Sequence, residues 1–484
     1  MSDKAKTLIS DAIDAIHKRE FWAAYPEHPK AYGEGASEKG LENFKSMLNA
    51  PFTMLKQKGA DKFVGEEVSP YTRQSLGIKY PTFEYDTLII RAGRARAQWV
   101  EASVDERAEV LHDALERIKD KFFEIAYATM HTTGQSFMMS FQASGPHSND
   151  RALEAMALGY QELKRFPETV RWNKPMGKFN LEVDKKYKPV PRGIALSIGC
   201  STFPVWNSVP GIFASLITGN PVIVKPHPKS VLPIAIVVAE MQAAFEAKGF
   251  DANTVQLAVD TVDEPITVEL MENPAVKIID YTGSSGFGDL VEALVDKVTF
   301  TEKAGVNSVI IDSTSNLQAM TQNLAFALSL YSGQMCTAPQ NIFIPEGGIK
   351  TDNGHVSFDD VLKSIKDSVN GLSGNPKMGA GTLGALQTED TMKRMEAARG
   401  MGNSIVVDAA KVHNQEFPDA RTCSPVVLSL DSKDREVYSG EMFGPIAFVI
   451  KTKDTKESVE KARELATREG AITCAAYTTN PDTA

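Results

Sequence analysis

The residue best suited to covalent chemistry is Cys336, in the segment Ser332-Gly333-Gln334-Met335-Cys336-Thr337-Ala338-Pro339. A helical pattern precedes this segment and a strand-like run follows it, so we expect the thiol on a short loop between two rigid elements. Such a loop can keep a nucleophile accessible and fix its direction. Because a lone cysteine is more often a small buried hydrophobe, the assignment depends on the groups around it.

Two other residues could assist a thiol, and both come after strand-like segments. Asn207 carries a neutral amide that can stabilise an oxyanion, and Glu302, in Thr301-Glu302-Lys303-Ala304-Gly305, carries a carboxylate that can act as a base. Alone, Asn207 is as typical of a turn, and Glu302 of an exposed surface. Together with Cys336 they supply the groups that acyl or aldehyde chemistry requires.

Three further segments favour a bound dinucleotide. Tyr281-Thr282-Gly283-Ser284-Ser285-Gly286-Phe287-Gly288 follows a strand and opens a helix, where glycines let backbone amides approach a pyrophosphate. Lys225 ends the run Val222-Ile223-Val224-Lys225 and could reach a ribose or a phosphate. Glu441-Met442-Phe443-Gly444-Pro445 places an acid and an aromatic ring before a turn. Each segment alone is weak evidence, because such turns and solvated lysines are common.

The elements that position these residues alternate from about residue 190. Short β-branched runs predict strands at 194–198, 221–225, 255–259, 276–281, 308–311, 341–344, 426–430, 446–450 and 472–477, with helices at 232–247, 317–331 and about 456–467. This order predicts an α/β fold with a doubly wound parallel sheet, whose ligands bind beyond the carboxyl ends of the strands. Residues 86–165 read as helical, with Ser103 and Glu106 forming a capping box.

We expect three parts along the chain, because 484 residues exceed one ordinary core. These are an N-terminal leader with a helical start (1–85), a dinucleotide-binding domain with a helical front section (86–300), and a second α/β domain that bears the catalytic thiol (301–484).

Composition narrows the class of protein. The net charge of −10 gives no electrostatic footprint for nucleic acid, so local groups must hold any anionic ligand. Four scattered cysteines without a CxxC pair indicate neither a disulfide framework nor a metal site. No apolar stretch approaches the ~20 residues of a membrane span. We therefore expect a cytoplasmic protein that does not enter a membrane.

Taken in order, these motifs resemble the aldehyde dehydrogenase superfamily from about residue 88 to the end. The resemblance implies an NAD- or NADP-dependent oxidation of an aldehyde, with Cys336 as nucleophile, Glu302 as general base and Asn207 as oxyanion donor. It also implies the following cofactor-binding residues: Trp206, Lys225, Lys229, Gly283, Ser284, Gly288, Glu441 and Phe443. The nearest likeness is the branch of phenylacetate degradation, which implies an aromatic aldehyde or a coenzyme A-linked semialdehyde as substrate.

Two departures from the family pattern modify these expectations. Where the family often has an acid three residues after the strand-end lysine, this chain has Pro228, followed by Lys229. Because no carboxylate would then receive a ribose 2′-hydroxyl, we expect NADP to be slightly favoured over NAD. The chain also stops at Ala484, where the family continues with an oligomerisation strand; a homo-oligomer is expected if the full-length chain carries that strand.

Three alternatives stay open from the sequence. A coenzyme A-acylating dehydrogenase would form the same thioester and release it to a thiol. A cysteine hydrolase or acyltransferase would need a histidine near Cys336, and the cysteine segment contains no histidine. A catalytically silent homologue would bind no nicotinamide.

Overall fold

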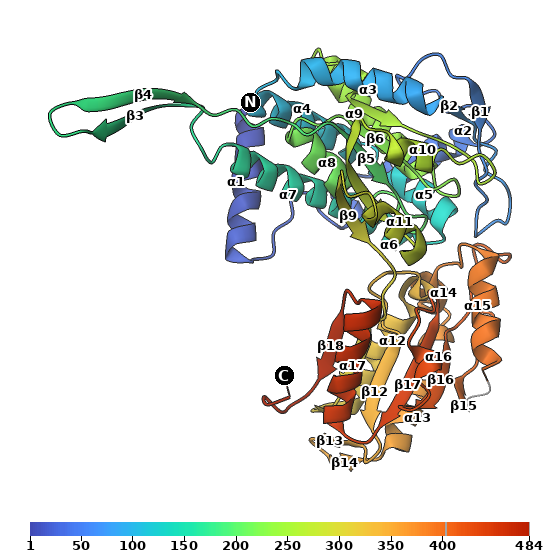
Figure 1. Ribbon diagram of the computed structural model, residues 1–484. Helices are drawn as coiled ribbons and strands as arrows, with labels where there is room; N and C mark the ends of the chain where they lie inside the picture. Colours follow the sequence, from blue (N-terminus) through green and yellow to red (C-terminus); the bar gives the residue numbers. More distant parts are fainter. Residues whose placement is uncertain (402–403, 484) are drawn as a thin grey trace.

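The computed structural model describes residues 1–401 and 404–483 of the chain. Two units, each with its own parallel sheet between layers of helices, lie one above the other in Figure 1. The predicted α/β architecture with a doubly wound parallel sheet is confirmed.

The first unit has a five-stranded parallel sheet in the order β7-β6-β5-β8-β9. Its strands are β5 (Ile194–Ile198), β6 (Val222–Lys225), β7 (Val255–Leu257), β8 (Val276–Thr282) and β9 (Val298–Glu302). The chain runs outward from β5 to β7 and then returns to β8 on the other side of β5. Ligands of such sheets bind where the order reverses, which here lies at the carboxyl ends of β5 and β8.

Helices cover both faces of this sheet. One face shares a core with α4 (Val104–Lys119), α5 (Phe122–Thr133), α6 (Phe137–Ser144), α7 (Pro146–Leu163), α8 (Val209–Ile217) and α9 (Leu232–Ala247). The other face packs against α3 (Tyr85–Trp99), α10 (Thr267–Glu272) and α11 (Ser285–Glu292), and the short helix η2 (Ala252–Thr254) precedes β7. The predicted capping box of Ser103 and Glu106 opens α4.

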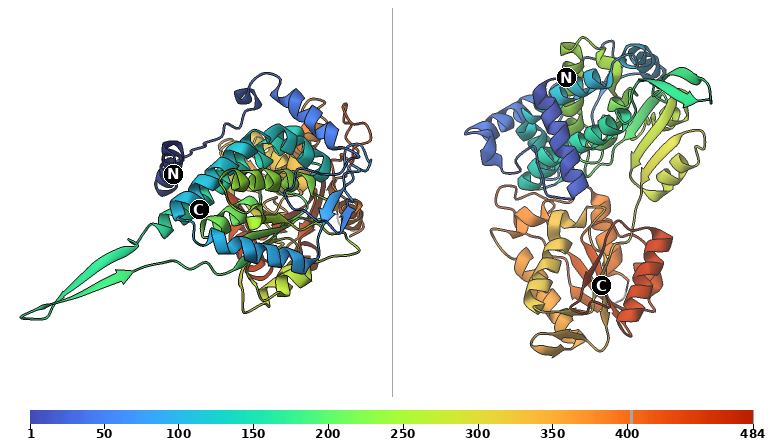
Figure 2. Two further views of the ribbon diagram at one scale, coloured as in Figure 1. Left: turned by 90° about the horizontal axis from the view of Figure 1, so that it is seen from above. Right: turned by 90° about the vertical axis from the view of Figure 1, so that its left-hand side faces the viewer.

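The N-terminal 85 residues pack onto this first unit. They form α1 (Asp3–Lys18), η1 (Pro29–Tyr32), α2 (Ala36–Met47), β1 (Lys62–Val64) and β2 (Tyr80–Thr82), with β1 and β2 antiparallel. Ile9 of α1 and Phe44 of α2 are buried in the same core as α4 to α9, and Figure 2 shows α1 lying against this unit. We propose that these residues form one domain with the five-stranded sheet, and that this domain ends after Glu302, the last residue of β9.

The second unit has a six-stranded sheet in the order β15-β16-β17-β12-β10-β18, in which β15 alone runs antiparallel. Its strands are β10 (Ser308–Ile311), β12 (Asn341–Pro345), β15 (Ser404–Val407), β16 (Val426–Asp431), β17 (Ile446–Thr452) and β18 (Cys474–Tyr477). The sequence placed the start of the last strand at Ile472. Instead, the backbone amides of Ile472 and Thr473 donate to the side chain of Asn307, so the ladder begins at Cys474.

Helices also cover the second sheet. One face packs against α12 (Leu317–Ser329) and α13 (Phe358–Ser373), and the other against α15 (Glu389–Arg399), α16 (Arg435–Tyr438) and α17 (Thr455–Glu469). Smaller elements are η3 (Leu330–Gly333), α14 (Gly379–Leu383) and a small sheet of β11 (Ser313–Thr314), β13 (Ile349–Thr351) and β14 (Gly354–Val356). Within the described residues, no helix is both long and apolar enough to cross a membrane.

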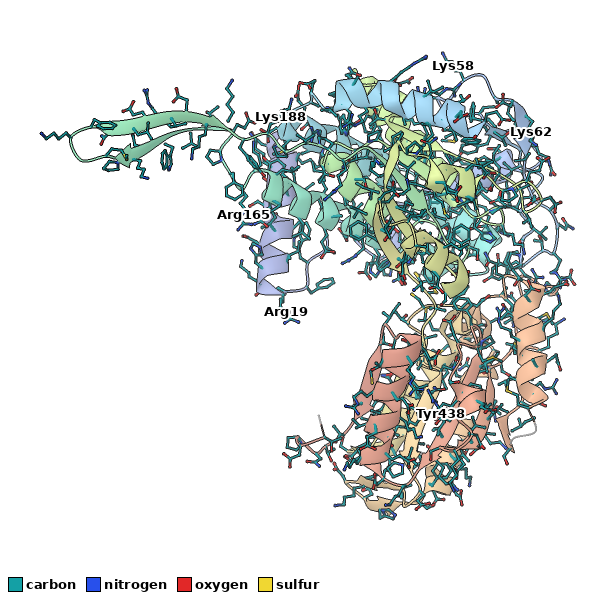
Figure 3. All side chains as sticks on the ribbon, in the orientation of Figure 1. Arg19, Lys58, Lys62, Arg165, Lys188 and Tyr438 are labelled. Atoms are coloured by element: carbon teal, nitrogen blue, oxygen red, sulfur yellow. The ribbon has the colours of Figure 1, made fainter. Side chains whose placement is uncertain are left out.

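A two-stranded hairpin, β3 (Thr169–Pro175) with β4 (Asn180–Lys186), projects from the first unit. Every residue of both strands is exposed. Arg165 and Lys188 mark its base in Figure 3. The sequence analysis placed no element here.

Candidate active site

One cavity of about 680 Å³ lies at the carboxyl ends of the first sheet and is closed from the other side by the second unit. The first unit contributes 198–203 after β5, 225–228 after β6, 260–262 after β7, 281–284 at the end of β8, and 302–304 after β9. The second unit contributes Cys336, Arg394, Glu441 and Phe443. The cavity therefore sits at the position that the order of the strands predicts.

The three residues expected to be catalytic all line this cavity. The Nδ2 of Asn207 donates to the Oε2 of Glu302 at 3.0 Å, and Glu302 lies close enough to Cys336 for its carboxylate to raise the pKa of that thiol. The fold thus brings an amide, a carboxylate and a thiol from three distant segments into one connected group.

The thiol of Cys336 is held in its protonated form. Burial is the largest cause, followed by the nearby carboxylate of Glu302, and together they raise the pKa of Cys336 to about 12. A thiol in contact with a carboxylate has an acceptor for its proton already in place.

The backbone before Cys336 is strained in a way that fixes the cysteine loop. Tyr331, Ser332 and Gly333 all have φ between +50° and +60°, the left-handed region. The Tyr331 hydroxyl donates to the carbonyl of Thr133 at 2.7 Å, and the Ser332 hydroxyl donates to the carbonyl of Leu383 at 2.9 Å. These buried bonds hold the turn, whose sharp reversal ends α12 at Ser329 rather than at the predicted Tyr331.

Asn307, which the sequence analysis did not single out, anchors the same loop. Its Nδ2 donates to the carbonyls of Cys336 (2.7 Å) and Ala338 (3.0 Å), and its Oδ1 accepts from the amides of Ile472 and Thr473. One buried side chain therefore ties the cysteine loop to the segment that enters β18.

The glycine turn after β8 lies beside Glu302, because Thr282 pairs with Glu302 in the sheet and the amide of Gly283 donates to the Glu302 carbonyl at 3.0 Å. A Cβ on Gly283 would lie 2.4 Å from the Tyr281 hydroxyl, so any other residue would displace the tyrosine ring. Ser284 is the N-cap of α11, and its side chain makes no capping hydrogen bond. The first amides of α11 thus remain for an anionic ligand.

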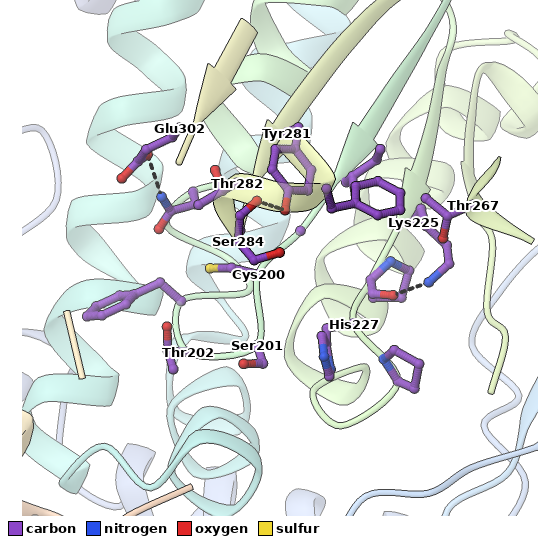
Figure 4. Close-up of a pocket in the computed structure, with 18 of the residues that line it drawn as sticks. Cys200, Ser201, Thr202, Lys225, His227, Thr267, Tyr281, Thr282, Ser284 and Glu302 are labelled. Atoms are coloured by element: carbon purple, nitrogen blue, oxygen red, sulfur yellow. Dashed lines mark hydrogen bonds between the residues drawn. The ribbon is translucent and has the colours of Figure 1, made fainter. Parts of the chain in front are cut away.

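Figure 4 shows the two ends of the cavity, with Glu302 at one end, Lys225, His227 and Thr267 toward the other, and Tyr281 and Ser284 between them. We call this second end the ribose end. There the Nζ of Lys225 lies 2.6 Å from the Oδ1 of Asp260, a residue that the sequence analysis did not single out.

Three of the residues expected to bind the cofactor lie outside the cavity lining. The ring of Trp206 packs against His147. Lys229 is close enough to Asp390 for its charge to lower the pKa of that carboxyl, whose hydrogen bond to Lys393 is the larger cause. Gly288 lies one turn into α11, where a Cβ would meet the side chain of Lys303 at 2.5 Å. Gly288 therefore serves packing beside the site.

The remaining predicted residues, Glu441 and Phe443, line the cavity from the second unit. Arg394 of α15 lines it too, and its Nε donates to the carbonyl of Phe443 at 2.9 Å. Cys200, in the loop after β5, places a second thiol in the lining, and burial raises its pKa. Neither Arg394 nor Cys200 belongs to a segment that the sequence distinguished.

Comparison with protein families matches residues 62–484 to the "Aldehyde dehydrogenase family". The chain is 44% identical to an NAD-dependent aldehyde dehydrogenase from Burkholderia multivorans of known structure, with a TM-score of 0.96 over 99% of this chain and 86% of that one. It is 23% identical to a benzaldehyde dehydrogenase [NAD(+)] of Pseudomonas putida over 79% of this chain and 73% of that protein. It is 21% identical to the α-ketoglutaric semialdehyde dehydrogenase of Bacillus subtilis, over 79% of this chain and 75% of that protein.

Proposed function

The chain belongs to the aldehyde dehydrogenase family, and on that premise we propose that it oxidises an aldehyde to the carboxylic acid through a thioester on Cys336, with NAD or NADP as hydride acceptor. The observation that carries the proposal is the connected group of Asn207, Glu302 and Cys336 at one end of the cavity.

The residues at the cavity fit a dinucleotide. The uncapped N-terminus of α11 suits a pyrophosphate, and the apolar side chains of Val262, Pro265 and Phe287 border a space suited to a flat base. We propose that Glu441 and Phe443, which line the cavity from the second unit, bind the nicotinamide half. When bound, the nicotinamide supplies the hydride-accepting carbon.

The protein's own groups account for the remaining steps. The sulfur of Cys336 adds to the aldehyde carbon, its proton passes to the nearby Glu302 and from there to solvent, and the carbonyl oxygen becomes an oxyanion. Loss of hydride from this adduct leaves the thioester. Glu302, ionised again, then takes a proton from water as the water oxygen attacks the thioester carbon; the C–S bond breaks, the acid is released, and Glu302 returns that proton to the sulfur of Cys336.

Asn207 has two N–H groups and two proposed tasks. One N–H donates to Glu302, which fixes the direction of the carboxylate. We propose that the second N–H stabilises the oxyanion, as the sequence analysis expected.

The roles of Cys336 and Glu302 can be separated by substitution. Cys336→Ala should abolish formation of reduced nicotinamide, whereas Glu302→Gln should release about one hydride per site and then turn over at least about a hundredfold more slowly, because the thioester is no longer hydrolysed. Stopped-flow absorbance of the reduced nicotinamide measures both. Cys474→Ala, which changes an exposed thiol in β18, is the matched control. Sustained wild-type turnover by Glu302→Gln would remove Glu302 from the mechanism.

For the substrate we propose an aromatic aldehyde or the coenzyme A-linked semialdehyde of phenylacetate breakdown. The aromatic side chains of Phe203 and Phe443 in the lining support this class, as does the similarity to a benzaldehyde dehydrogenase. Steady-state kinetics with aromatic, aliphatic and semialdehyde substrates test it. Product analysis with and without coenzyme A decides whether water or a thiol takes the acyl group.

The hydrolase alternative finds little support in the site. Within the described lining, the histidine is His227, which lies at the ribose end, away from Glu302 (Figure 4). A cysteine hydrolase requires its base beside the thiol.

We further propose a cytoplasmic location, which the four free cysteines support. We also propose a homo-oligomeric assembly, for which the projecting hairpin is the candidate contact.

A further inference from the structure

The ribose end of the cavity is built around a buried ion pair. The side chains of Lys225 and Asp260 are 4% and 2% exposed, and their charged atoms are 2.6 Å apart. The Nζ of Lys225 also donates to the carbonyl of Pro226 at 2.6 Å, and the Oδ2 of Asp260 accepts from the amide of Ile266 at 3.1 Å. Both side chains are therefore held in place, the Oδ1 of Asp260 accepts no hydrogen bond among the described residues, and the ammonium keeps an N–H for a ligand.

Among the described residues that line this end, the groups other than Lys225 add no free positive charge. Burial lowers the pKa of His227 to about 4, so its ring is neutral at neutral pH. Lys229 lies outside the lining, although its charge is one of the smaller causes that lower the pKa of His227. The amine of Lys303 is paired with Asp289 and Glu292 at 2.9 Å each. Arg394 lies with Phe443, in the part of the lining that the second unit supplies.

We propose that Asp260 makes the cavity select a dinucleotide with a free 2′-hydroxyl, NAD, over one with a 2′-phosphate, NADP. The inference rests on the proposed function, since it places the adenosine ribose beside Lys225. The expected slight preference for NADP relied on the lack of an acid at Pro228. In the folded chain the acid comes instead from the end of the neighbouring strand β7.

The physical reason is the charge at this end. A 2′-phosphate carries nearly two negative charges at neutral pH, and the Lys225 charge that could receive it is already offset by Asp260. The same carboxylate would repel the phosphate. A neutral ribose hydroxyl meets no such electrostatic repulsion and can accept a hydrogen bond from the free N–H of Lys225.

The test is titration calorimetry of the full chain with NAD and with NADP, without aldehyde. The wild type should bind NAD at least about tenfold more tightly, a difference of about 1.4 kcal/mol. Asp260→Asn frees the Lys225 charge and should tighten NADP binding at least about tenfold relative to NAD. Asp260→Glu, which keeps the charge, should retain the wild-type order, and Asp263→Asn, which removes an exposed acid from the same loop, should change neither affinity.

Each outcome decides between the proposals. Equal affinity for the two dinucleotides in the wild type, or tighter NADP binding, overturns the role of Asp260 and leaves the dehydrogenase function intact. If neither dinucleotide binds, both proposals fall. Thermal unfolding shows whether Asp260→Asn is folded, and where it is not, the wild-type ratio and the Asp260→Glu variant still decide.

Discussion

At the scale of single residues, the site keeps its nucleophile inactive until a base acts on it. The pKa of Cys336, raised to about 12, leaves very little thiolate at neutral pH. The carboxylate of Glu302 contributes to that shift and is also the group that can remove the proton. The same contact thus protects the thiol from solution electrophiles and prepares it for the aldehyde.

This contact predicts an unusual pH dependence of alkylation. Because the pKa of Cys336 is raised, iodoacetamide should react slowly at neutral pH in the cofactor-free protein. As the pH is increased toward that pKa, the rate of alkylation should rise about tenfold for each pH unit. Glu302→Gln removes a negative charge and a carboxylate acceptor, so the pKa falls and the profile should move to lower pH. Peptide mass spectrometry of the labelled cysteine measures both profiles.

A matched control for this experiment is Glu346→Gln, an exposed acid after β12, which should leave the profile unchanged. A wild-type profile that levels off near neutral pH would show that Cys336 is an ordinary or acidic thiol. No shift in Glu302→Gln would show that burial alone sets the pKa.

The sequence identified the residues whose chemistry is visible in a short motif, and the fold brings most of them to one cavity. The sequence analysis missed Asp260 and Asn307 because their roles depend on partners distant in the chain. Asp260 pairs with Lys225 on a neighbouring strand, and Asn307 binds the cysteine loop after η3. A lone acid or amide after a short run carries no local signal of such a partner.

At the scale of elements, the turn between α12 and β12 carries the strain that directs Cys336. Each non-glycine residue in the left-handed region costs about 1 kcal/mol or more, and Tyr331 and Ser332 both adopt it. The periodic apolar pattern of α12 gives no sign of this reversal, which tertiary hydrogen bonds impose. By contrast, the β-branched runs located the buried strands well, because burial on both faces leaves a continuous apolar signature.

Gly333 is the point where this turn can be tested. It has a φ of +60°, and a Cβ there would lie 2.4 Å from the carbonyl oxygen of Gly444, next to Phe443. Gly333→Ala should therefore destabilise the fold by about 1–3 kcal/mol and lower kcat at least about tenfold, by moving the cysteine loop away from its partners. Denaturant unfolding and steady-state kinetics measure the two effects.

The control is Gly371→Ala in α13, where a Cβ meets nothing within 4 Å. Alanine is the better helix former, so this variant should be as stable as the wild type or slightly more so. Wild-type kcat and stability in Gly333→Ala would show that the loop tolerates displacement.

At the scale of the whole molecule, the projecting hairpin is the feature that the isolated chain does not explain. In its register Trp172 lies opposite Val183, so Val170, Trp172, Leu181 and Val183 share one face with Lys174 and Lys185, and each of the four apolar residues is more than a third exposed. Alternating apolar residues are present in the sequence, but alternation does not reveal that the strands stand clear of the body. An isolated two-stranded hairpin is marginally stable in water.

This apolar face predicts that the hairpin is covered by a second copy of the chain. Its polar face, with Arg171 and Asn173, alternates with the apolar one, which is the pattern of a strand pair buried on one side. Trp172→Asp should weaken assembly by about thirtyfold or more, because a tryptophan at the centre of an interface contributes about 2 kcal/mol or more. Light scattering across a dilution series measures the dissociation, and Asn173→Asp, on the polar face of the same strand, should leave it unchanged.

A wild-type chain that stays monomeric at micromolar concentration would contradict the prediction. So would a Trp172→Asp variant that assembles as the wild type does, since the apolar face would then lie outside the contact.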